Sequence, residues 1–262
     1  GFIGNDLYNY FKTEGVECFC PSRDYQFTKE EELGHVIYCI GLTSDFREKP
    51  FETVEAHVCK LKEVLSKSSF DSFLYLSSTR VYNGVSLGIE SNPLIVNPND
   101  FSDLYNISKI MGESICLALP NEKVRIVRLS NVLGEDFTSG NFIFSLIGEA
   151  VDKGIIHLNQ SSAIERDYIT IKSVLHLIES IAINGKERIY NLASGINISN
   201  QKIIETISAI TKCELVEKEK LKNLSFPLIN SQKIKSEFAY SPENIIEEVV
   251  ELVKNYKKKE NQ

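Results

Sequence analysis

A tyrosine and a lysine lie four residues apart at Tyr105 and Lys109, so a helix would present both on one face. A free tyrosine, with a pKa of about 10, is a poor base at neutral pH, and a nearby ammonium favours the phenolate and lowers that pKa. Upstream, an apolar run at 73–76 ends in two serines, of which Ser78 would orient a substrate hydroxyl or carbonyl. If these three side chains converge, the chain contains a site for acid–base catalysis of hydride transfer.

The spacing of tyrosine and lysine is not informative by itself. The same pattern occurs at three other places, Tyr8/Lys12, Tyr25/Lys29 and Tyr168/Lys172. Only Tyr105 begins a predicted helix that follows a strand ending in hydroxyls. The context therefore selects Ser78, Tyr105 and Lys109 as the candidate catalytic residues.

The first half of the chain alternates predicted helices and strands with short links. Apolar spacing predicts helices at 4–14, 51–65 and about 103–117, and apolar runs predict strands at 16–20, 36–40, 72–77 and 124–129. This alternation is typical of βαβ units. Continuous apolar strands are typical of a parallel sheet covered by helices on both faces.

The second half is less regular and predicts a second packed lobe. Helices are expected at 142–152, 172–183 and 199–210, with short strands at 155–158 and 189–192. Ser241 and Pro242 predict the start of a last helix, as an N-cap followed by proline at the first helical position. We expect a dinucleotide-binding domain at 1–130, to which 166–194 return, and a mainly substrate-binding lobe at 131–262.

Two glycine-containing stretches predict where a dinucleotide would bind. The opening residues Gly1, Phe2, Ile3 and Gly4 lead into a helix, whose N-terminus suits a pyrophosphate. Cys39, Ile40 and Gly41 end a buried strand, where small residues let a dinucleotide cross the strand ends; a simple strand-ending glycine explains Gly41 equally well.

The loop after the strand at 16–20 bears on the choice of dinucleotide. It contains Ser22 and Arg23, which favour the 2′-phosphate of NADP, whereas Asp24 keeps NAD open.

Composition excludes several other classes of protein. The 262 residues suffice for one large α/β domain or two modest ones, and the net charge of −7 gives no general attraction to nucleic acid or anionic lipid. Six cysteines and four histidines show no zinc-ligand spacing, so we expect no metal and reduced thiols in a cytoplasmic protein. No apolar run approaches membrane-spanning length, so no membrane partner is expected.

Together these residues resemble the extended short-chain dehydrogenases/reductases, specifically the NAD(P)-dependent sugar-nucleotide epimerase/dehydratase family. The similarity runs through nearly the whole chain. Its landmarks are the opening glycines, the segment 76–82 with the catalytic Ser78, the Tyr105/Lys109 pair, Arg128 to Gly134, Arg166 to Ile169, Tyr190 to Gly195 and Asn230 to Ile234.

The resemblance implies a fold and a set of roles. The fold is a Rossmann-type doubly wound parallel sheet, its first strand missing from this chain, with a smaller mixed α/β substrate lobe. Asn131 faces the substrate, Arg166 meets nucleotide phosphates, and Thr79, Arg80 and Tyr168 complete the expected substrate-binding set. The implied partner is a nucleotide sugar, and polysaccharide biosynthesis is the implied setting. Similar proteins pair with a second copy through the helices at 51–65 and 103–117, but packing on their own sheet explains the apolar faces of these helices equally well.

Two departures from the family pattern matter. The family begins with a strand and an earlier glycine before Gly1, so we expect an N-terminally truncated chain that is poorly stable and binds cofactor weakly. Dehydratases of the family carry Asp-Glu after the catalytic Ser/Thr, whereas this chain has Thr79 and Arg80. Neither can act as a carboxylate, so dehydration is not expected.

The sequence thus predicts an NAD(P)-dependent epimerase or 4-ketoreductase acting on a nucleotide-linked sugar. The alternative is a non-catalytic NAD(P)-binding sensor or scaffold of the same fold. The presence of Ser78, Tyr105 and Lys109 favours the enzyme.

Overall fold

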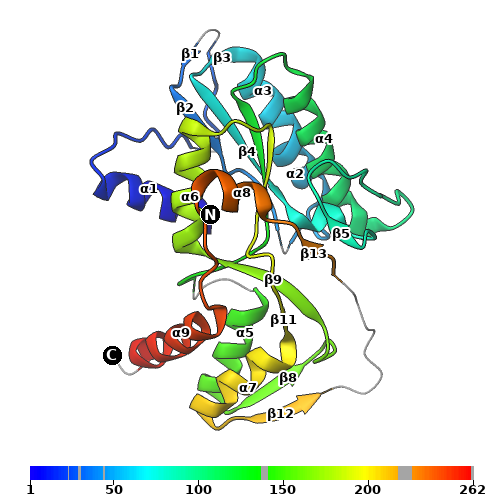
Figure 1. Cartoon of the computed structure of the whole chain (residues 1–262), viewed down its shortest axis with the longest axis vertical. Coiled ribbons are helices and arrows are strands. Elements are labelled where there is room, and N and C mark those ends of the chain that lie inside the picture. Colours follow the sequence, from blue (N-terminus) through cyan, green and yellow to red (C-terminus); the bar gives the residue numbers. More distant parts are fainter. Residues whose placement is uncertain (23, 29–30, 44, 137–140, 218–225, 261–262) are drawn as a thin grey trace.

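A four-stranded parallel sheet forms the centre of the upper half of the molecule (Figure 1). The computed structural model describes residues 1–262 except 23, 29–30, 44, 137–140, 218–225 and 261–262. The strand order is β10-β6-β4-β2, with bounds β2 His35–Tyr38, β4 Ser72–Ser78, β6 Val124–Leu129 and β10 Ile189–Leu192. All three pairings are parallel, so the carboxyl ends of the strands lie along one edge of the sheet.

Helices cover both faces of this sheet because its strands are apolar on both sides. Phe73 and Tyr75 of β4 pack with Leu61 of α3 (Lys60–Lys67) and Cys116 of α4 (Leu104–Ala118). Leu74 and Leu76, which alternate with them, pack instead against α6 (Ile171–Asn184) and α1 (Phe2–Thr13). Burial on both faces explains the uninterrupted apolar runs in the sequence.

A second hydrophobic core lies in the lower half of Figure 1. It is built mainly from α5 (Phe142–Gly148), α7 (Asn200–Thr211), α9 (Ile245–Glu260) and β8 (Ile155–Leu158). The exposed strand β12 (Glu214–Glu217) pairs with β8 in parallel. The three-stranded sheet β11-β9-β7, with bounds β7 Asn131–Leu133, β9 Glu165–Thr170 and β11 Asn197–Ser199, lies between the two halves. β7 follows β6 after one residue, so it continues directly from the carboxyl edge of the upper sheet.

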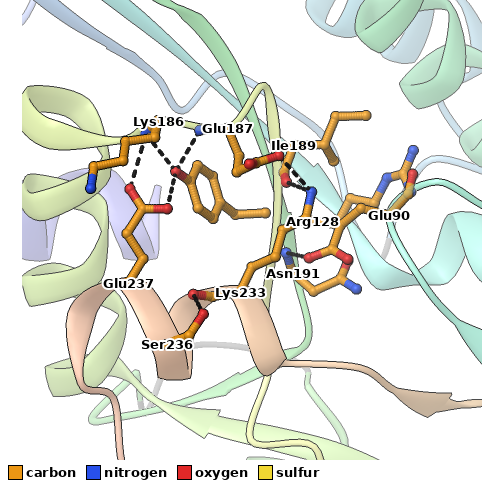
Figure 2. Close-up of polar contacts among 10 residues, drawn as sticks. Glu90, Arg128, Lys186, Glu187, Ile189, Asn191, Lys233, Ser236 and Glu237 are labelled. Carbon is orange, nitrogen blue, oxygen red and sulfur yellow. Dashed lines mark hydrogen bonds and ion pairs between the residues drawn. The ribbon is translucent and has the colours of Figure 1, made fainter.

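Polar contacts attach α8 (Gln232–Phe238) to the outer strand β10 (Figure 2). Glu237 accepts hydrogen bonds from the backbone N–H of Lys186 and from the hydroxyl of Tyr190, and Lys233 Nζ lies 3.1 Å from Glu187. Two short parallel pairs complete the fold: β1 (Glu31–Glu32) with β3 (Ser68–Ser69), and β5 (Leu87–Gly88) with β13 (Leu228–Ile229).

Most predicted elements are present, and three match residue for residue: β6, β8 and β10. The predicted strand at 16–20 is wrong. Val16 and Phe19 are 50% and 61% exposed, and no strand in the described part of the chain pairs with this segment. An apolar run becomes a strand only where a neighbouring backbone accepts and donates its hydrogen bonds.

The start of the last helix was also predicted wrongly. α9 begins at Ile245, after Ser241 and Pro242, and the side chain of Asn244 accepts the hydrogen bond from Ile246 N. Asparagine is as good a cap as serine, so the sequence offered two competing starts. Among the described helices, none has the length and apolar character needed to cross a membrane.

Candidate active site

Ser78 and Tyr105 meet at the carboxyl edge of the parallel sheet. Ser78 is the last residue of β4, and Tyr105 lies in the first turn of α4, which packs on β4. Tyr105 is only 7% exposed. Burial raises the pKa of Tyr105, while the neighbouring Ser78 hydroxyl opposes that rise. The structure therefore brings together the serine and the tyrosine selected from the sequence.

Lys109 lies one turn further along α4 and points at the same edge of the sheet. Its Nζ donates to the carbonyl of Leu76 at 2.9 Å, two residues before Ser78. The side chain is 5% exposed, and burial lowers the pKa of Lys109 to about 8, against the opposing charge of Glu113. A lysine so tuned holds a proton at neutral pH but can lose it more easily than a surface lysine.

Arg80 provides a cation beside Tyr105 that the sequence reasoning assigned only to substrate binding. Its guanidinium lies 5.5 Å from the centre of the Tyr105 ring and 5.0 Å from that of Phe46. The charge of Arg80 lowers the pKa of Tyr105 and so acts with Ser78 against burial. Arg80 and Thr79 belong to the 3₁₀ turn Thr79–Tyr82 that follows β4, and both are half-buried. The signal in the sequence was the position of Arg80 two residues after Ser78.

The two predicted dinucleotide-binding stretches lie side by side. Gly1 is the N-cap residue of α1, which contains Phe2, Ile3 and Gly4, and a Cβ on Gly4 would contact Cys39 at 3.5 Å. Cys39 follows β2, so the N-terminus of α1 abuts the end of that strand. Helix α1 carries no side-chain cap, and its backbone N–H groups stay available to an anion.

Gly41 packs closely against Lys109 of α4 and against His57. A Cβ at this position would lie 3.3 Å from Lys109 Nζ and 3.0 Å from His57 Nε2. The missing side chain lets the backbone after Ile40 pass close beside Lys109 and His57. Ser22 is exposed, and Arg23 lies outside the described residues, so the preference for NADP stays a prediction.

Sequence reasoning did not select His57. It is fully buried in a π-helical turn (Glu55–Cys59), and its ring meets the Tyr105 ring edge-on at 5.4 Å. A histidine on the apolar face of an amphipathic helix was the only signal, and it equally fits a buried core histidine.

Besides Thr79 and Arg80, the predicted substrate residues lie on strands β7 and β9. Asn131 Nδ2 donates to the carbonyl of Asp167 at 2.8 Å. The Arg166 guanidinium lies 5.5 Å from the Phe142 ring and 4.6 Å from the Phe226 ring and bonds to Asn200. Tyr168 is 4% exposed and packs in the second core. The roles of Asn131, Arg166 and Tyr168 in substrate binding stay predictions.

One further carboxylate organises this region. Asp167 accepts hydrogen bonds from Ser194 N, Gly195 N and Ile196 N at 2.7–3.0 Å, and from Ser194 Oγ at 2.9 Å. It thereby holds the loop after β10 against β9. The described residues contain no group of three His, Cys, Asp or Glu side chains placed to hold a metal ion.

Comparison with protein-family models gives one match. The model of the NAD dependent epimerase/dehydratase family covers residues 1–193. A search of curated proteins found no match.

Solved structures with the same fold cover nearly the whole chain. RMD from Pseudomonas aeruginosa, complexed with NADPH, is 17% identical with a TM-score of 0.76, over 99% of this chain and 96% of that one. MoeE5, in complex with UDP-glucuronic acid and NAD, is 13% identical with a TM-score of 0.81, over 99% and 97%. UDP-glucose 4-epimerase from Thermotoga maritima, with UDP-glucose, is 15% identical with a TM-score of 0.76, over 99% and 96%. The fold is therefore the Rossmann-type α/β fold predicted from the sequence.

Proposed function

Because this chain belongs to the NAD dependent epimerase/dehydratase family, we propose that it is an NAD(P)-dependent epimerase or 4-ketoreductase of a nucleotide-linked sugar. The observation that carries the proposal is the convergence of Ser78, Tyr105 and Lys109 at the carboxyl edge of the sheet. The neighbouring Gly41 leaves this edge open to a dinucleotide. In parallel α/β sheets, ligands bind outside this edge.

The residues present fit a nicotinamide dinucleotide. The uncapped N-terminus of α1 would hold the pyrophosphate, and the stretch from Cys39 to Gly41 would lie along the rest of the cofactor. Lys109 would hold the nicotinamide ribose. When bound, the nicotinamide would exchange a hydride, one proton with two electrons, with the reacting sugar carbon.

Three side chains manage the proton at the reacting oxygen. Tyr105, as phenolate, takes the proton of the sugar hydroxyl during oxidation and returns it during reduction. Ser78 hydrogen-bonds the same oxygen and so fixes its distance from Tyr105. Arg80 supplies positive charge near the phenolate, which favours its formation against the effect of burial.

The side chains after Ser78 favour hydride transfer without loss of water. The resemblance to the family implies that its dehydratases carry two acids directly after the catalytic Ser/Thr. This chain has Thr79 and Arg80 at these two positions. Neither threonine nor arginine can serve as the acid and the base that elimination of water needs. Among the reactions of the family, we therefore favour epimerisation or ketone reduction.

The proposal is tested first by what the protein binds. Mass spectrometry of the nucleotide retained by the purified protein identifies NAD or NADP. The protein is then incubated with UDP-, GDP- and dTDP-linked hexoses and uronic acids. A new isomer without net change in NAD(P)H indicates an epimerase, whereas NADPH consumption with a keto-sugar indicates a reductase. A product lighter by one water would contradict the role given to Thr79 and Arg80. Failure to bind either dinucleotide would contradict the whole proposal.

We also propose that the chain pairs with a second copy through α2 (Pro50–Val54) and α4. Phe51 on α2 is 86% exposed and Met111 on α4 is 50% exposed, and these helices contact each other. Light scattering should give the mass of a dimer, and the double variant Phe51→Glu/Met111→Glu should give that of a monomer. A wild-type monomer at all concentrations would contradict this pairing.

A further inference from the structure

A chain of three hydrogen bonds joins the predicted cofactor-binding segment to the catalytic helix through His57. Leu42 N, next to Gly41, donates to His57 Nε2 at 3.2 Å. His57 Nδ1 lies 2.8 Å from Ser108 Oγ. Ser108 Oγ in turn donates to the carbonyl oxygen of Tyr105 at 2.9 Å.

The donors in this chain of hydrogen bonds fix the tautomer of His57. The backbone N–H of Leu42 can only donate, so Nε2 must be unprotonated and accept. The hydroxyl proton of Ser108 is used on the Tyr105 carbonyl, so Ser108 Oγ must accept from Nδ1. The imidazole is therefore neutral with its single proton on Nδ1. Burial and the charge of Lys109 lower the pKa of His57 to about 3, which keeps the ring in this form.

The backbone around His57 is itself held by the sheet. The π-helical turn leaves carbonyl groups without their usual helical partners. Tyr38 of β2 donates to the carbonyl of Ala56 at 2.6 Å, and Tyr75 of β4 donates to that of His57 at 3.4 Å. Both hydroxyls are buried, so two strands of the sheet fix the place from which the imidazole reaches toward Gly41 and Tyr105.

We propose that His57 is a positioning residue that couples cofactor binding at the Gly41–Leu42 segment to the placement of Tyr105 on α4. The imidazole contacts both sides at once, through the Leu42 bond and through Ser108 together with its edge-on contact to the Tyr105 ring. A shift of the Gly41–Leu42 backbone on cofactor binding is transmitted through His57 and Ser108 to the backbone of Tyr105. The role of the cofactor in this inference rests on the proposed function, whereas the bond chain does not.

The tautomer can be tested without any measurement of activity. The chain has four histidines, so ¹⁵N-histidine labelling gives a small spectrum in which His57→Asn identifies the His57 signals by their disappearance. We expect a protonated Nδ1 and an unprotonated Nε2 whose signals stay unchanged across the pH range around neutrality. A proton on Nε2, or an imidazolium at neutral pH, would overturn the bond chain.

Two substitutions at His57 separate the two halves of the hydrogen-bond chain. His57→Asn places an amide N–H where Nδ1 donates to Ser108 but removes the acceptor for Leu42. His57→Gln places an amide oxygen where Nε2 accepts from Leu42 but removes the donor to Ser108. The loss of one net hydrogen bond changes an equilibrium or rate constant about fivefold. His57→Asn should weaken NAD(P)H binding, measured by fluorescence, about fivefold with kcat nearly kept. His57→Gln should keep the dissociation constant and lower kcat about fivefold.

The control is His157→Asn, the same change at a half-exposed histidine on β8, which should alter neither quantity. If both His57 variants bind cofactor and turn over like the wild type, or lose both properties equally, the coupling is wrong and His57 only fills the core. If the wild type binds neither NAD nor NADP, the proposed function fails together with the coupling. The nitrogen spectrum still decides the bond chain in that case.

Discussion

The two sides of the candidate site each rest on a buried carboxylate, but the two carboxylates are neutralised differently. On the α4 side, Glu113 receives the guanidinium of Arg128, with Nη2 and Oε2 2.6 Å apart, and both side chains are 4% exposed. On the β9 side, Asp167 receives only neutral donors, mainly backbone N–H groups of the loop 194–196. Burial raises the pKa of Asp167 in spite of these bonds.

This difference separates a rigid side of the site from an adjustable one. Glu113 lies one turn after Lys109, and Arg128 also donates to Tyr82 Oη at 2.7 Å and to the carbonyl of Glu90 at 3.3 Å (Figure 2 shows Arg128 beside Glu90 and Asn191). The helix that carries Tyr105 is thereby attached to the sheet by a buried ion pair, and separating its partners has a large free-energy cost. The loop on the β9 side is held by directional but uncharged donors, which water or a ligand can replace at a smaller cost.

The largest expected effect is on catalysis at the α4 side. Tyr105→Phe removes the proton acceptor but keeps the ring between Phe46 and His57. We expect kcat to fall about 10²–10⁴-fold, the usual worth of a general base, with cofactor affinity close to that of the wild type. The matched control is Tyr8→Phe, which belongs to the same Tyr-x-x-x-Lys pattern on α1 and should keep full activity. Retained activity of Tyr105→Phe would remove the proposed base.

The charge pair of the α4 side should dominate stability. Glu113→Gln leaves the Arg128 guanidinium buried without its counter-ion, so we expect the free energy of unfolding to fall by about 3–5 kcal/mol. Urea denaturation of both proteins measures this. The double variant Glu113→Leu/Arg128→Met removes both charges and should recover much of the loss. A Glu113→Gln protein as stable as the wild type would show that the pair does not hold α4.

The same kind of substitution on the β9 side should cost less. Asp167→Asn keeps the shape, but one oxygen becomes an NH₂ group that faces an N–H or O–H donor of the loop. Because no buried cation is left alone, we expect a loss of about 1–3 kcal/mol. Hydrogen exchange should show faster opening at Ser194, Gly195 and Ile196 while the amides of α4 keep their protection. Equal losses for Asp167→Asn and Glu113→Gln would remove the distinction between the two sides.

The sequence predicted the parallel sheet because burial on both faces leaves a strong local pattern. β6 and β10 are mostly apolar, and their bounds were predicted to the residue. The stretch 16–20 has a similar composition but is not a strand, because pairing depends on a neighbour that no local pattern reveals. The domain division at 130/131 stays a prediction.

The candidate catalytic residues were selected for a different reason. Ser78, Tyr105 and Lys109 stand out through order and context along the chain, and the structure brings all three to one edge of the sheet. The contacts that tune them were not predictable. His57 and Arg80 reach Tyr105 only through the packing of the helix 55–59 and the turn after β4, and side-chain contacts over such distances leave no spacing rule in the sequence.

Arg80 provides the smallest effect and the finest test of the α4 side. Its positive charge lowers the pKa of Tyr105, so Arg80→Gln should raise that pKa. The phenolate then forms only at higher pH, and the ascending limb of the pH–rate profile for sugar oxidation should move upward. A cation near an aromatic ring is worth about 0.5–1 kcal/mol, which corresponds to a shift of about 0.4–0.7 pH units. Arg47→Gln is the control, because this exposed arginine lies 4.4 Å from the Phe46 ring centre and should shift the limb less. An equal shift in both variants would mean that the general positive field, and not the contact of Arg80 with the Tyr105 ring, sets the ionisation of the tyrosine.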